Sequence, residues 1–272
     1  MNAFFKNMST SVNGQAYYAE SVNVSESIQI EYFSAMGTKN YSAFPTKKPE
    51  GSISMSFYIT TGEEINAIES GYANTGFSSI QVGPFSTDYA LLNSFSVSSD
   101  PNSIIKGDAT YSYYGQINSG QVPDQMNDTI VPAHGAASID SMEDFGANRI
   151  LDFNYSFSQS FDVKYSLGSP SPSKVTMTDA TRSMSINNLI SDTDYEKTNL
   201  TGASGLCNNN EGEGISKRTG CITLKTLCQN RVGQLDISGY IESRSFSASP
   251  GGELIESLDI TEKYVKETGC DG

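Results

Sequence analysis

The sequence predicts a mainly β protein of two tandem, similar β-sandwich or β-barrel domains, each with a short helix and a long extended hairpin. The first observation is a repeat, because SESIQIEY at residues 25–32 returns as SQSFDVKY at residues 158–165. The second is that SFSVS at 94–98 returns as SFSAS at 245–249, each followed by a Pro, an apolar pair and an Asp-x-Thr. The third is a period-two alternation of polar and apolar residues, which is typical of half-buried strands.

The repeat divides the 272 residues into a first domain at 1–115, a linker at 116–146 and a second domain at 147–272. Each copy is close to the usual size of a domain. The spacing between copies grows from 133 to 151 positions, so the second copy gains a net 18 residues, which we place around 202–220. The linker lacks clean periodicity and is rich in Gly, Asp, Asn and Pro, as surface loops are.

In the first copy, residues 17–33 and 51–60 alternate and predict the two long strands of the hairpin. The residues between them include Gly, Asn and two prolines, so 37–49 predicts a loop or a flared tip. Thr61 can cap a helix at 61–68, because two glutamates follow it in the first turn. Three further strands are expected, at residues 79–82, 89–99 and 103–114.

The second copy repeats this order of elements. We expect its strands at residues 152–165, 181–190, 221–227, 234–248 and 253–263. Residues 167–173 contain two prolines and predict a loop in place of the flared tip. Residues 191–196 occupy the position of the helix in the first copy and predict a short helix start.

Composition excludes several functions. The formal net charge of −14 and the lack of any basic run disfavour nucleic-acid binding, which needs Lys and Arg on the phosphates. The hydrophobic share of 37% is modest, but aromatic residues reach 10%, too many for a disordered chain. No apolar stretch approaches a membrane span and no export signal is visible, so we expect a soluble protein with no membrane partner.

The sequence lacks recognisable catalytic machinery. A Ser-His-Asp triad would have to include His134, the only histidine, yet no Gly-x-Ser-x-Gly nucleophile motif is present. Carboxylate pairs such as Glu63-Glu64 are expected by chance in a chain with 31 acidic residues. No Gly-rich phosphate loop or calcium loop is complete. We therefore predict no enzymatic activity, no catalytic residue, no metal and no cofactor.

Four cysteines, Cys207, Cys221, Cys228 and Cys270, all lie in the second copy. Their spacing contains no Cys-x-x-Cys pair and no histidine is near, so a zinc site is disfavoured. One or two disulfides near the insertion would form in an oxidising environment, and free thiols would persist in a reducing one. Cys221 and Cys228 would lie at opposite ends of one strand, too far apart to bond to each other. A bond between Cys207 and Cys221 would then close the inserted loop.

The strand pattern resembles the tail-tube (major tail) protein family of tailed bacteriophages. The resemblance rests on residues 25–32 with 51–59, on 95–114 with 246–264, and on the strand–Ser-Ser-Asp-Pro–strand pattern of residues 94–110. It implies a structural virion protein, made in the host cytoplasm, whose rings stack into a tube through which DNA passes without specific binding. Most such proteins have one domain and form hexamers, so a duplicated version implies a trimer that forms a pseudo-hexameric ring. The other implied partners are phage tail proteins.

An acidic bore would not retain DNA, because it offers no cations to the phosphates. Candidates for acidic residues facing the bore are Glu26, Glu31, Glu50 and Asp162. One alternative is a phage decoration or receptor-binding protein of two β-sandwich modules, with exposed aromatics such as Tyr113-Tyr114 or Tyr17-Tyr18. A β-rich carbohydrate-active enzyme is another alternative, and it would require two carboxylates facing each other across a cleft.

Overall fold

The computed structural model describes residues 10–34, 36, 41–45, 49–99, 103–120, 132–133, 150–167, 169, 171–190, 218–225, 231–248 and 254–264. These residues form one helix and 14 strands, which confirms a mainly β protein. The expected helix at 191–196, most of the expected insertion at 202–220, and His134 lie outside the described residues. So do Cys207, Cys228 and Cys270, together with the side chain of Cys221.

The first half contains nine strands and the helix. In chain order they are β1 (Thr10–Val12), β2 (Gln15–Ser27), β3 (Ile30–Phe33), β4 (Ser42–Pro45), β5 (Glu50–Tyr58), α1 (Gly62–Glu69), β6 (Ser78–Val82), β7 (Phe85–Ser99), β8 (Lys106–Tyr114) and β9 (Asn118–Ser119). The second half contains β10 (Ile150–Tyr165), β11 (Pro172–Ile190), β12 (Arg218–Lys225), β13 (Arg231–Ala248) and β14 (Leu254–Lys263).

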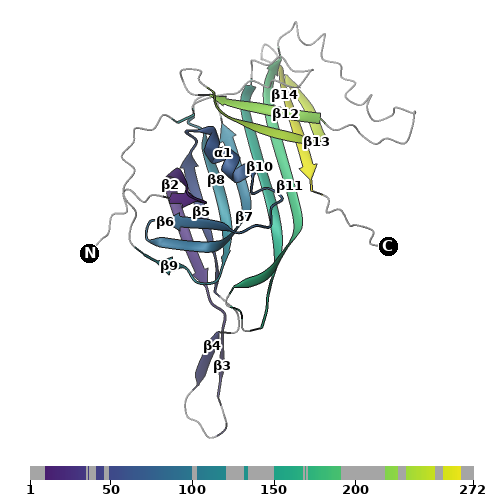
Figure 1. The fold of residues 1–272 in the computed structure, drawn as a ribbon. Helices are drawn as coiled ribbons and strands as arrows, with labels where there is room; N and C mark the ends of the chain where they lie inside the picture. The colour runs from purple at the N-terminus through teal and green to yellow at the C-terminus, as the bar shows by residue number, and fades with distance from the viewer. Residues whose placement is uncertain are drawn as a thin grey trace, which may run out of the picture.

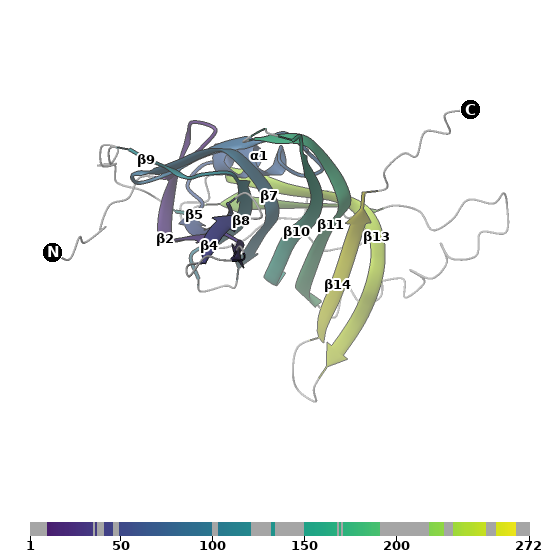
Figure 2. The ribbon, with the colours of Figure 1, turned by 90° about the horizontal axis from the view of Figure 1, so that it is seen from below.

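Twelve of these strands form one sheet (Figure 1). In the first half the pairing runs β7-β6-β1-β2-β5-β8 and returns to β7, so six strands close into a barrel. From β7 the sheet continues into the second half in the order β10-β11-β14-β13-β12, and Figure 2 shows this extension curving away from the barrel. All of these pairs are antiparallel.

The two halves use the same order of strand pairing. In the first half it is β2-β5-β8-β7-β6, and in the second it is β10-β11-β14-β13-β12. The residue registers differ, however: Ser96 lies opposite Asp108, whereas Asp259 lies opposite Ser243 and not opposite Ser247. The division into two domains stays a prediction, because one sheet and one cluster of buried side chains extend through both halves.

Three expected boundaries differ from the structure. The first long strand ends at Ser27 and resumes as β3, and the expected loop at 37–49 contains β4, which pairs with β3 in a separate two-stranded ribbon. The expected linker also begins with β9, which pairs with β7. Within the same linker Ala133 is buried. Its N–H donates a hydrogen bond to the carbonyl of Ile59 and its carbonyl accepts one from the N–H of Ile105, so this part of the linker packs against the first half.

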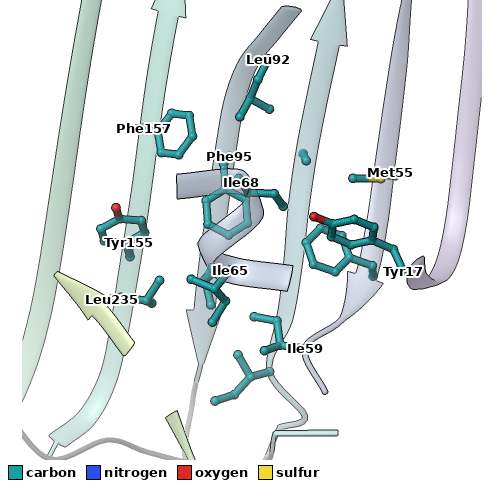
Figure 3. Close-up of a cluster of buried hydrophobic side chains, with 14 of the residues drawn as sticks. Tyr17, Met55, Ile59, Ile65, Ile68, Leu92, Phe95, Tyr155, Phe157 and Leu235 are labelled. Atoms are coloured by element: carbon teal, nitrogen blue, oxygen red, sulfur yellow. The ribbon is translucent and has the colours of Figure 1, made fainter. Parts of the chain in front are cut away.

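The helix lies against the apolar side of the sheet and joins the two halves. Its N-terminus begins at Thr61 as predicted, and the buried carboxylate of Glu64 accepts hydrogen bonds from the backbone N–H groups of Thr60 and Thr61 at 2.7 and 3.1 Å. Ile65 and Ile68 are buried between residues of both halves (Figure 3). The helix contacts β2 and β13.

Close packing at the start of the helix requires glycine on both partners. A Cβ atom on Gly62 would lie 2.7 Å from the carbonyl oxygen of Val232 in β13. A Cβ atom on Gly233 would lie 3.2 Å from the Cα of Gly62. The missing side chain of Gly62 therefore allows the helix to approach the backbone of β13 closely, and the missing side chain of Gly233 adds room on the other partner.

Gln159 of β10 ties the segment that follows the helix to the sheet. Its buried amide donates to the carbonyl oxygens of Gly71 and Leu92 at 2.8 and 2.6 Å, and its Oε1 accepts from the N–H of Ala73 at 2.9 Å. One side chain of the second half thus satisfies three backbone groups of the first half. Such groups are costly to leave unpaired when buried.

We expect Gln159→Leu to lower the free energy of unfolding by about 3 kcal/mol, because it leaves these backbone groups without partners. Urea denaturation followed by circular dichroism measures the loss. The neighbouring Ser160→Ala, at an exposed position, is the control and should change stability by less than about 0.5 kcal/mol. Equal effects of the two substitutions would contradict this role for Gln159.

Candidate functional site

One side of the large sheet is covered by small polar side chains, and we call it the hydroxyl face. Its longest row crosses seven strands, β2, β5, β8, β7, β10, β11 and β14, through the directly paired residues Ser21, Ser56, Asp108, Ser96, Ser156, Ser183 and Thr261. The next row crosses the same strands through Asn23, Ser54, Thr110, Ser94, Ser158, Thr181 and Lys263.

The hydroxyl face follows from period-two alternation in every one of these strands. The residues between the hydroxyls point to the other side, where they are buried with α1; examples are Phe57, Phe95 and Tyr155. Figure 3 shows several of these side chains gathered around Ile65 and Ile68. The sheet therefore has one apolar, covered side and one polar side that the described chain leaves uncovered over much of its area.

Hydrogen bonds between neighbouring strands hold the hydroxyl groups close to the sheet. The Oγ atoms of Ser25 and Ser52 lie 2.8 Å apart, and those of Ser156 and Ser183 lie 3.0 Å apart. A shallow hollow of about 400 Å³ lies at the centre of the face, between Asp108, Thr110 and Ser183. The result is a broad, low surface of short side chains.

The hydroxyl face contains few charges. In its two long rows the ionisable residues are Asp108 and Lys263. A third row contains Lys106 and Asp259. The ammonium of Lys106 lies 2.7 Å from Glu20 and holds the pKa of that carboxyl below its usual range. Across these rows the dominant groups are neutral hydroxyls, which neither attract nor repel a polyanion strongly.

The four acidic residues predicted for a bore lie in different places, and all are exposed. Glu50 and Asp162 share the strand side of Ser52 and Ser158, so both extend the hydroxyl face at its edge. Glu31 lies on β3, outside the large sheet. Glu26 lies on the opposite side of β2, together with Val24. Burial of the Tyr113 hydroxyl raises its pKa to about 12, and the negative charge of Glu26 adds to this effect. Their role in a bore stays a prediction.

The ribbon of β3 and β4 projects from the body and exposes aromatic side chains (Figure 1). Tyr32 and Phe44 are 68% and 59% exposed, and the rings of Phe33 and Phe44 pack 5.2 Å apart. By contrast, Tyr17 and Tyr113, which we considered as exposed aromatics, are buried in the core. The prediction of exposed rings at Tyr17 and Tyr113 was therefore wrong, and the exposed aromatic side chains of the ribbon lie elsewhere in the chain.

A cluster of charged and aromatic groups lies where α1 meets the second half. Arg182 of β11 contacts Glu69 of α1 at 3.4 Å and Glu262 of β14 at 3.7 Å, and its guanidinium lies 4.1 Å from the centre of the Tyr72 ring. The hydroxyl of Tyr155 donates to Glu69. Burial raises the pKa of Glu69 despite these favourable partners. Because each group is used in joining α1 to β10, β11 and β14, we assign the cluster a structural role.

Other kinds of site receive no support within the described ranges. No group of three or more His, Cys, Asp or Glu side chains there could hold a metal ion. Nor does that part of the chain contain a helix long and apolar enough to cross a membrane. The expected cysteine pairs fall outside the described side chains and stay predictions.

No protein-family model matches the sequence, and no curated protein matches it either.

Glu69 gives a prediction for the pH dependence of stability. Its pKa is raised in the folded state, so its protonated form favours folding, and this contribution is lost as the pH rises through the folded pKa. The difference in unfolding free energy between the native protein and Glu69→Gln should therefore fall as the pH rises above about 4.5. Urea titrations at a series of pH values measure it.

The matched control is Asn66→Gln, at an exposed position on the same helix; neither side chain ionises over this range, so the difference should stay flat. A difference for Glu69→Gln that rises with pH would show that the charged carboxylate stabilises the fold.

Proposed function

We propose that this protein is a structural subunit of a bacteriophage tail tube, assembling into stacked rings that enclose the path of the phage DNA. The observation that supports this most is the hydroxyl face, which extends across seven paired strands with few charges. In the proposed tube this face lines the bore. Neutral hydroxyls offer the phosphates no cations, so passing DNA would not be held.

The net charge of −14 supports the same proposal. A polyanion gains affinity for a protein chiefly by exchanging its counterions for Lys and Arg contacts. Lys106, in the third row of the hydroxyl face, is already paired with Glu20. The bore would therefore offer few cations to the phosphates, with Asp108 near its centre and Glu50 and Asp162 at its edge.

The repeated order of strand pairing supports a ring in which each chain fills two similar positions, so that the ring needs half as many chains as positions. Each chain supplies two series of strands paired in the same order, so three chains would form a pseudo-hexameric ring. The projecting ribbon, with Tyr32 and Phe44 exposed, is suited to contacts between rings or with other tail proteins. The proposal places the protein in the virion after synthesis in the host cytoplasm, without enzymatic activity or cofactor.

A second candidate function is that of a phage decoration or receptor-binding protein. The observation that favours it is the ribbon itself, because exposed aromatic side chains such as Tyr32, Tyr41 and Phe44 are common in binding surfaces. Under this alternative the ribbon binds a partner and the hydroxyl face is ordinary solvated surface.

Electron microscopy of the purified protein tests the tube proposal. We expect rings or tubes with threefold or pseudo-sixfold symmetry and an open axial channel. Particles that stay monomeric across protein concentrations and salt conditions would contradict the proposal. Tail particles labelled by an antibody against this protein only at an outer tip would favour the receptor-binding alternative.

A charge placed on the hydroxyl face should change how assembled particles interact with DNA. We expect Ser156→Arg rings to retain DNA at low salt and release it as the salt concentration rises, because each arginine contacts a phosphate. Filter binding at a series of salt concentrations measures the retention. Asn66→Arg, which adds the same charge at an exposed position on α1, is the control and should leave DNA unbound. Equal retention by both variants would contradict a bore lined by the hydroxyl face.

A further inference from the structure

Several strand edges in the described chain lack a neighbour on one side, and two of them lie on β13 and β2. β12 pairs with β13 only as far as Gly239, so residues 245–248 have β14 on one side and no described strand on the other. β1 pairs with β2 only from Gln15 to Tyr17, so residues 21–25 have β5 on one side and no described strand on the other. Edges of this kind are ready to pair with another chain.

The molecule already contains a strand pair of the kind that these two edges would form. The first part of β7 pairs with β6, and on the same side its last part, Ser94–Ser99, pairs with Phe153–Ser158 of β10. In the second half, β13 corresponds to β7 and β12 to β6, but nothing described occupies the place of β10. The strand that corresponds to β10 is β2, whose edge is exposed.

We propose that the free edge of β13 pairs antiparallel with the free edge of β2 in a second copy of this chain. The sequence repeat sets the register: Ser94 and Phe95 correspond to Ser245 and Phe246, while Ser158 and Phe157 correspond to Ser25 and Val24. Because Ser94 lies opposite Ser158 and Phe95 opposite Phe157, the pair between chains places Ser25 opposite Ser245 and Val24 opposite Phe246.

This register keeps the two sides of the sheet continuous from one chain to the next. Ser25 lies on the hydroxyl face beside Ser52, and Ser245 lies beside Ser257 on the same face. Val24 and Phe246 point to the opposite, apolar side, where Val24 packs against the core. A shift by one residue would place Phe246 opposite an exposed serine or asparagine, so it is disfavoured.

The contact is heterologous, because it joins the β13 edge of one chain to the β2 edge of the next. Repeated head to tail, it closes into a ring if the rotation between chains is right and otherwise extends as a filament. The inference deepens the proposed tube and rests on it for the closed ring. The strand contact itself can be tested whether or not tubes form.

Cysteine crosslinking between separate chains tests the register. We would prepare Asn23→Cys and Ser247→Cys as two proteins, because these exposed positions lie opposite each other in the proposed pair. After mixing and mild oxidation we expect a disulfide-linked dimer in the mixture. Each variant alone should give no more dimer than the unsubstituted protein, which controls for the four native cysteines.

The matched control mixes Asn23→Cys with Ser243→Cys, an exposed position on the same side of β13 but four residues away, about 13 Å along the strand. No dimer with Ser247→Cys, or an equal or greater yield with Ser243→Cys, would overturn the proposed register. Rings in the microscope without the crosslink would reject this contact and leave the tube proposal standing. The crosslink without rings or tubes would confirm the contact and reject the tube.

Discussion

The pairing of β7 with β10 is the constraint on which the rest of the structure depends. Phe95 lies opposite Phe157 and Ser94 opposite Ser158, so apolar residues of the two halves meet on one side and hydroxyls on the other. Without this pair, the sheet of the first half would close on itself as a barrel and would not continue beyond β7. Because of this pair, the second half continues the same sheet, and both its apolar side and its hydroxyl face become continuous.

The other contacts between the halves reinforce that pair from the apolar side. Gln159 lies on β10, one residue beyond the segment that pairs with β7, and its side chain satisfies backbone groups of the first half. Arg182 of β11 contacts Glu69 of α1. Gly62 and Gly233 allow α1 to approach β13 closely. These contacts join the two halves without using any residue of the hydroxyl face, which stays available for a different purpose.

Period-two alternation predicted most strands well, because each has one buried and one polar side; β8, for example, alternates in burial along its whole length. The helix was predicted from Thr61 and its two glutamates, and the structure confirms it. β1 was missed, although Asn13-Gly14 is a strong hairpin signal and both residues adopt positive φ angles. β4 was missed because Pro45 and its neighbours were interpreted as a loop, and a ribbon with no buried side gives no alternation to detect.

The candidate site was harder to predict, because it depends on register. Serines such as Ser96, Ser156 and Ser183 are unremarkable along the chain, and only strand pairing places them in one row. Of the four acidic residues predicted for a bore, Glu26 and Glu31 lie away from that row. The sequence repeat indicated the repeated order of strand pairing. It did not indicate that β10 would pair with β7, because these two strands are separated along the chain by the whole linker at 116–146.

In the proposed tube the hydroxyl face lines an enclosed channel. A side-chain-resolution electron microscopy reconstruction of the assembled protein tests it most directly. We expect Ser96 and Ser156 to face the axial channel, with β2 of each chain hydrogen-bonded to β13 of the next. A reconstruction that places these serines on the outer surface, or against another protein layer, would contradict it.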